Sequence, residues 1–167
     1  MKTMARLVMI GASMAMLASP GVVLAQFACT TNADRTITIV KYTGEEGSLS
    51  IPGTIDDLPV VSIGNYAFSG TGLTSVTIPN GVTAIGVQAF GFCTNLTRVT
   101  ISKSVASLGY GAFYNCVNLT RVYFKGNSPN LGSCVFDNDE KATIYYLSGT
   151  TGWGATCGGR PAEVWNQ

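Results

Sequence analysis

The sequence predicts a repeat solenoid, a mainly β stack of about four to five coils of 22–23 residues that is capped at both ends. An aliphatic residue and a glycine recur five and four positions before a repeating phenylalanine. No stretch of the repeating unit keeps helical periodicity for the ten or more residues that a helix needs. A fixed period of this size indicates stacked units that cannot bury their apolar faces alone. The phenylalanine recurs at steps of 22, 23 and 23 residues, at Phe68, Phe90, Phe113 and Phe136.

The first 25 residues are typical of an export signal. Lys2 and Arg6 give a charged start, residues 7–17 are an apolar run, and residues 23–25 offer a cleavage site before Gln26. A buried N-terminal helix is the alternative interpretation. No later segment approaches the ~20 apolar residues of a membrane span, so the mature chain is predicted to lack one. We therefore expect a secreted or cell-surface protein, with the periplasm as another destination.

Residues 26–48 are predicted to close the N-terminal end of the stack. Within them, residues 36–40 alternate as a strand does, and we expect them to cap the first coil because an open sheet edge recruits other chains. The first repeat, residues 49–72, is irregular since residues 53–59 lengthen the link between its extended pieces.

Residues 73–95 show the repeating unit in its most regular form, and residues 96–118 and 119–136 repeat it with drift. Residues 76–78 alternate apolar and polar side chains, as in a strand with one buried face. Pro79 ends that strand because proline donates no hydrogen bond to a ladder.

The second half of the unit is predicted to return the chain to the next coil. Residues 82–85 form a second short extended piece, and Gly86 permits the turn that follows. Residues 89–93 then close the coil with a tight helical or 3₁₀ turn that drives Phe90 inward. Stacking places equivalent residues in core columns, which comprise the four repeating phenylalanines with Leu73, Leu96, Leu119, Ile85 and Leu108.

Residues 137–167 are predicted to form the C-terminal cap. Residues 143–147 alternate as the last strand, and Trp153 and Trp165 are expected to fold over the final coil. The alternative is that these two tryptophans form a platform for a ligand.

Two of the five cysteines, Cys93 and Cys116, each follow the repeating phenylalanine by three residues. They therefore share one position in neighbouring coils and belong to the predicted core. Buried thiols that fill a column are one interpretation, and a disulfide between coils is the other. The pairing of Cys29, Cys134 and Cys157 stays open.

The chemistry of the side chains argues against an enzyme. The chain has no histidine, which removes the usual general base and the commonest metal ligand. No C-x-x-C pair is present, so we expect no metal site and no cofactor. Residues 137–140 carry oxygen ligands for Ca²⁺, but their spacing favours a solvated turn.

The outward side chains of the principal sheet are the candidate ligand-binding residues. Alternation places Arg98 and Arg121 in one exposed column and Tyr123 in the next, while Lys103 and Lys125 lie just past the strand ends. Residues 58–136 contain these four cations and no Asp or Glu. Arginine and tyrosine are favoured at interface centres, although charges that merely keep the solenoid soluble are the alternative.

The unit also resembles a known family. Residues 73–93 read L-x-x-V-x-I-P-x-x-V-x-x-I-G-x-x-A-F-x-x-C, which resembles the BspA-like leucine-rich repeats of exported bacterial proteins. The resemblance extends over residues 49–136, although Ser102 and Lys125 replace the proline and Cys134 is shifted out of the cysteine column. It implies a right-handed leucine-rich-repeat stack used for protein binding, adhesion or surface display, and it supplies no catalytic residues.

Three functional hypotheses follow from these observations. The leading one is an exported, non-catalytic module that recognises a protein or mediates adhesion through the exposed sheet face. The second is a structural spacer in a surface assembly. The third is weak binding of an acidic glycan; nucleic acid is not expected because four cations make only a small patch.

Overall fold

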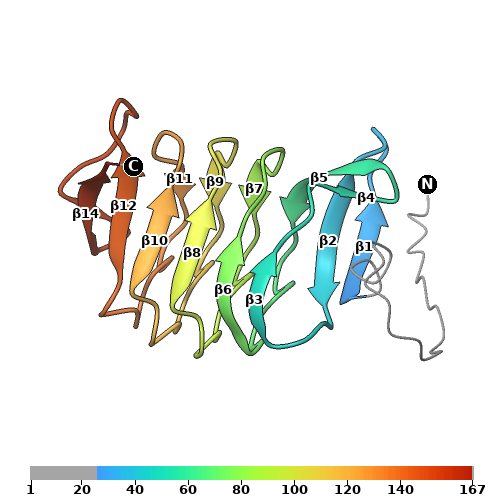
Figure 1. The fold of residues 1–167 in the computed structure, drawn as a ribbon, viewed down its shortest axis with the longest axis horizontal. Coiled ribbons are helices and arrows are strands. Elements are labelled where there is room, and N and C mark those ends of the chain that lie inside the picture. Colours follow the sequence, from blue (N-terminus) through green and yellow to red (C-terminus); the bar gives the residue numbers. More distant parts are fainter. Residues whose placement is uncertain (1–25, 167) are drawn as a thin grey trace.

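The computed structural model describes residues 26–166, which form a solenoid with two sheets running along the stack (Figure 1). The predicted export signal, and the alternative N-terminal helix, lie outside the described residues. Within residues 26–166, no helix has the length and apolar character needed to cross a membrane. The prediction of a mainly β solenoid is confirmed.

The principal sheet has seven strands, and its neighbouring coils pair in parallel. Its central strands face the viewer in Figure 1, and each coil contributes one of them. The order along the sheet is β13 (Thr156–Cys157), β14 (Arg160–Trp165), β12 (Thr143–Leu147), β10 (Arg121–Phe124), β8 (Arg98–Ile101), β6 (Leu73–Thr77) and β3 (Gly47–Ser50).

The second sheet lies behind the principal one in Figure 1, and its strands β7, β9 and β11 in the regular coils have only two residues each. The core fills the space between the two sheets, since the strands of both bury alternate side chains. The order along this sheet is β1 (Phe27–Thr31), β2 (Ile37–Tyr42), β5 (Leu58–Ile63), β7 (Ala84–Ile85), β9 (Ser107–Leu108) and β11 (Asn130–Leu131), with β4 (Thr54–Ile55) paired to β5.

The N-terminal end is closed by a hairpin that the sequence did not reveal. Strand β2 corresponds to the expected cap strand and pairs in parallel with β5, while β1 pairs with β2 in antiparallel fashion. The ring of Tyr42, at the end of β2, stacks on Phe68 with centroids 5.2 Å apart, and Phe27 packs against both rings, 5.4 Å from Tyr42 and 6.4 Å from Phe68. The Tyr42 ring therefore continues the phenylalanine column into the cap, and Phe27 packs beside it.

The phenylalanine column forms the centre of the core. Phe68, Phe90, Phe113 and Phe136 are fully buried, and their stacked rings are separated by 4.8, 5.2 and 5.5 Å. The ring planes lie within 16° of parallel. The predicted aliphatic columns, Leu73, Leu96, Leu119, Ile85 and Leu108, are buried around it.

The repeated glycine serves close packing of the coils, which corrects the predicted role of Gly86 in a turn. Gly86 and Gly109 do not take a positive φ. A Cβ atom on Gly109 would instead lie 2.7 Å from the backbone carbon of Gly86, and one on Gly86 would lie 2.8 Å from that of Gly64. The glycine column thus lets the backbones of successive coils approach one another.

The coil closes with separate tight turns, where a helical or 3₁₀ segment was expected. The N–H of Gly91 donates to the Gln88 carbonyl at 3.0 Å, and that of Cys93 donates to the Phe90 carbonyl at 3.4 Å. Between them, the Phe90 N–H donates to the Ala112 carbonyl of the next coil at 2.8 Å. Hydrogen bonds between coils therefore interrupt the local ones, and no helix propagates.

Two positions of each closing turn take a left-handed backbone, two residues before and two residues after the core phenylalanine. Glycine and asparagine tolerate this conformation best, so Phe92, with φ of 61°, is unusual there. The residues before the phenylalanine are Tyr66, Gln88, Gly111 and Cys134, and those after it are Gly70, Phe92, Asn115 and Asn138.

The cysteine column is a buried polar ladder. The thiols of Cys93 and Cys116 donate to the Phe68 and Phe90 carbonyls, each at 3.1 Å, and both side chains are fully buried. The hydrogen bond with Cys93, together with burial, raises the pKa of Cys116. All five cysteines are free thiols in this structure.

Asp139 occupies the next position of this ladder, three residues after Phe136. Its Oδ1 accepts the Cys116 N–H at 2.6 Å, whereas Oδ2 is buried without a hydrogen-bond partner. Burial raises the pKa of this carboxyl to about 7, against the opposing effects of the Cys116 N–H and the Arg160 charge. The carboxylate therefore ends the ladder, and it does not belong to a solvated acidic turn.

Only one of the two tryptophans, Trp153, covers the end of the core. Trp153 stacks on Tyr146 at 4.9 Å and contacts Phe124 at 5.0 Å, so it covers the end of the core as expected. Trp165 does not, because it lies on the outward face of β14 against Tyr123. The expectation that Trp165 caps the core is wrong.

Candidate binding face of the principal sheet

The outward face of the principal sheet is organised in columns set by the strand register. Ser48 pairs with Ser75, Ser75 with Arg98, and Arg98 with Arg121. The alternate residues Val76, Val99 and Val122 point into the core and are buried. One column therefore changes from serine to arginine along the stack, and both arginines are exposed.

The neighbouring column changes from small to aromatic. Thr77 pairs with Thr100, Thr100 with Tyr123, and Tyr123 with Tyr145, which in turn faces Glu163 on β14. All of these side chains are exposed or half-buried. The outward face thus carries small side chains over the N-terminal coils and bulky rings over the C-terminal ones.

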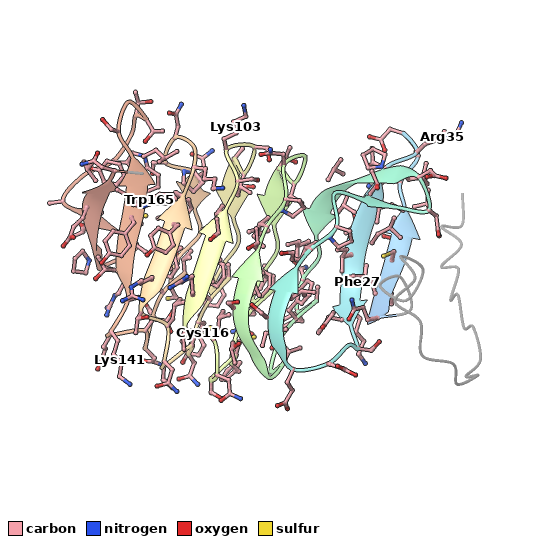
Figure 2. The ribbon with its side chains drawn as sticks, in the orientation of Figure 1. Phe27, Arg35, Lys103, Cys116, Lys141 and Trp165 are labelled. Atoms are coloured by element: carbon pink, nitrogen blue, oxygen red, sulfur yellow. The ribbon has the colours of Figure 1, made fainter. Side chains whose placement is uncertain are left out.

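Three outward rings, Tyr123, Tyr145 and Trp165, form what we term the aromatic cluster. Tyr123 stacks on Tyr145 with centroids 5.2 Å apart, and Trp165 packs against Tyr123 at 4.8 Å with a 55° tilt. Figure 2 shows Trp165 over the C-terminal strands of the front sheet. Sequence reasoning missed Tyr145 as a member of this face, although Tyr145 follows Tyr123 by one repeat length, and it considered Trp165 only in the alternative of a ligand platform with Trp153.

The arginines adjoin the aromatic cluster. The guanidinium carbon of Arg98 lies 6.0 Å from the centroid of the Tyr123 ring, within the range of a cation–π contact. Arg121 lies two residues before Tyr123 on β10, on the same face. The structure therefore brings together three of the predicted site residues, Arg98, Arg121 and Tyr123.

Only one of the two predicted lysines borders the candidate face. Lys125 follows β10 directly and lines a shallow depression of about 190 Å³ together with Thr77, Thr100 and Ser102. Lys103 lies one residue further past its strand and sits at the rim of the solenoid, as Figure 2 shows. Lys125 thus borders the face, whereas Lys103 is separated from the arginine column.

The chemistry of these side chains suits binding. Exposed guanidinium and ammonium groups donate hydrogen bonds to anions, and aromatic rings supply apolar contact area. The thiols of Cys93 and Cys116 are buried, and the chain has no histidine to activate a nucleophile. Among residues 26–166, no three Cys, Asp or Glu side chains gather where they could hold a metal ion.

A mainly β stack with hydrogen-bonded coils and one variable outward face defines a leucine-rich-repeat solenoid. The BspA type Leucine rich repeat region matches residues 59–155 in six copies, which is more than half of the chain, and the chain belongs to this family. No curated protein matches the chain.

Solved bacterial structures share this fold. A T. pallidum Leucine Rich Repeat protein is 26% identical over 76% of this chain and 70% of its own, with a TM-score of 0.63. A leucine-rich repeat protein from Bacteroides capillosus is 27% identical over 72% and 94% of the two chains, with a TM-score of 0.65. A leucine rich cell surface protein from Faecalibacterium prausnitzii is 27% identical over 81% and 45%, with a TM-score of 0.54.

Proposed function

We propose that this chain is an exported, non-catalytic recognition module that binds a protein partner through the outward face of β8, β10 and β12. Arg98, Arg121 and Tyr123 lie at the centre of the proposed site, Lys125 borders it, and Lys103 contributes at its rim. The observation that carries the proposal is the arginine column beside the aromatic cluster. Neither feature is required by the fold, because serine and threonine fill the same columns in the first coils.

Membership of the family supports a binding role. Leucine-rich-repeat proteins generally bind other proteins and are generally not enzymes. The charged start and apolar run of residues 1–25 support export, as does the likeness to a leucine rich cell surface protein. Adhesion at a bacterial surface is the setting in which such a module would act, and the periplasm is the alternative destination.

Capture of the partner tests this proposal. Tagged protein lacking residues 1–25 is immobilised and exposed to medium and solubilised surface proteins of the source culture, and bound proteins are compared by mass spectrometry. We expect Arg98→Glu/Arg121→Glu to lose partners that the unsubstituted protein retains. The matched control is Arg35→Glu/Lys41→Glu, which makes the same charge change on two exposed residues of the N-terminal hairpin. Identical capture by both double variants would contradict the proposal.

A further inference from the structure

The register places two like charges side by side on the candidate face. Arg98 and Arg121 are direct neighbours on adjacent parallel strands, about 4.8 Å apart along the sheet. Like charges at such positions are destabilising. A carboxylate between them would remove the repulsion and accept hydrogen bonds from both guanidinium groups.

A third cation lies at the other end of the same strip of sheet. Lys125 is four residues after Arg121, so the two positions are roughly 13 Å apart at the rise of an extended strand. Tyr123 lies between them on β10, and the small side chain of Thr100 lies beside Tyr123 on β8, where it lines the shallow depression with Lys125. The strip over β8 and β10 is therefore cationic at both ends, and its middle consists of the small Thr100 side chain beside the Tyr123 ring.

This spacing matches an extended peptide. Side chains that point to one face of an extended chain recur every second residue, so residues i and i+4 are separated by the same ~13 Å. Carboxylates at i and i+4 would meet the arginine pair and Lys125, and the side chain at i+2 would meet the middle of the strip. Residues 58–136 contain no Asp or Glu side chain that would repel the carboxylates of such a ligand.

The ring geometry favours a peptide over a sugar. A sugar ring stacks on an open aromatic face, but Arg98 lies over one side of Tyr123 and Tyr145 stacks on the ring at 5.2 Å. Trp165 also packs against Tyr123, at 4.8 Å. The Tyr123 ring therefore offers its edge to an incoming group, which suits contact with an aliphatic or aromatic side chain.

We propose that the outward face of β8 and β10 binds an extended acidic segment of the partner protein, with carboxylates at i and i+4 and an apolar side chain at i+2. This inference rests on the proposed function and specifies the chemistry of the partner. One carboxylate lies between Arg98 and Arg121, the other pairs with Lys125, and the apolar side chain lies over Thr100 beside Tyr123.

Peptide binding measured by fluorescence anisotropy tests the inference. The probe is labelled Ser-Glu-Ser-Phe-Ser-Glu-Ser, and its controls are the same peptide with glutamine for glutamate and one with the two glutamates adjacent. We expect binding of the first peptide that weakens with salt, at least about tenfold weaker binding of both controls, and a similar loss in Arg98→Glu/Arg121→Glu. Lys125→Glu should lose affinity for the first peptide but not for the adjacent-glutamate peptide.

Several outcomes would overturn the inference. They are equal binding of the glutamine peptide, no binding up to millimolar protein, and Arg-dependent binding of polygalacturonate without binding of the peptide. The Arg35→Glu/Lys41→Glu variant controls for net charge, and thermal melts verify that each variant is folded. If partner capture depends on the arginines but the acidic peptide does not bind, only this inference fails and the proposed function stands.

Discussion

At the scale of single residues, Phe90 and Phe92 differ in burial and therefore in their contribution to stability. Phe90 is fully buried between the rings of Phe68 and Phe113. Phe92, two residues later, is 45% exposed and takes a left-handed backbone. The repeat length identifies the first as core, but nothing in the local pattern distinguishes the backbone of Phe92 from that of its neighbours.

Truncating these two phenylalanines should have unequal effects on stability. Phe90→Ala removes a ring from the middle of the core column, so we expect a loss of ~3–5 kcal/mol in the free energy of unfolding. Phe92→Ala loses mainly the edge contact with Tyr114 and should cost less than ~1 kcal/mol. Urea unfolding followed by circular dichroism measures both, and equal midpoints would contradict the assignment of the column.

Asp139 should make stability depend on pH. Burial raises the pKa of its carboxyl to about 7, from an ordinary value of 3.8. Between these values the folded state holds a proton that the unfolded state has lost, so this group destabilises the fold as pH rises through that interval. Asparagine keeps an oxygen that can accept the Cys116 N–H but does not titrate.

The stability of Asp139→Asn relative to the unsubstituted protein should therefore increase as pH rises from about 4 to about 7, and then stay constant. Urea unfolding at several pH values measures this difference directly. Because both proteins share every other titrating group, the comparison isolates Asp139. A constant difference across the interval would show that the carboxyl titrates normally in the folded state.

At the scale of the coil, the sequence predicts the alternating strand well and the closing turn poorly. Alternation at 76–78 and Pro79 locate the end of β6 because these signals are local. The turn at 89–93 is determined by hydrogen bonds to the next coil, such as that of Phe90 to Ala112. No signal within one repeat reveals those partners, which is why a helical turn was expected.

The spacing of coils provides an element-scale prediction. Gly109→Ala places a Cβ atom 2.7 Å from the backbone of Gly86, and backbone atoms packed in a stack cannot yield without moving a coil. We expect a loss of ~1–3 kcal/mol in unfolding free energy. Gly154→Ala is the matched control, since its Cβ atom would have no neighbour closer than 3.7 Å and its cost should stay within ~0.5 kcal/mol. Thermal melts that coincide for the two variants would contradict the close-packing role.

At the scale of the molecule, the sequence predicts those residues of the candidate face that lie within regular repeats. Arg98, Arg121 and Tyr123 were identified because alternation and a constant period fix their columns. Trp165 was misplaced because β14 lies beyond the last regular repeat, after an irregular loop at 148–155. Its position depends on where that loop returns the chain to the sheet, which no periodic signal encodes.

Site-specific crosslinking shows whether the partner binds the outward face of the principal sheet. A photoactivatable benzophenone amino acid is placed at Thr77 on that face or, as the control, at Asn130 on β11 of the second sheet; both positions are exposed. After irradiation with the captured partner, we expect crosslinked partner from position 77 and none from position 130. Crosslinking from position 130 alone would contradict it.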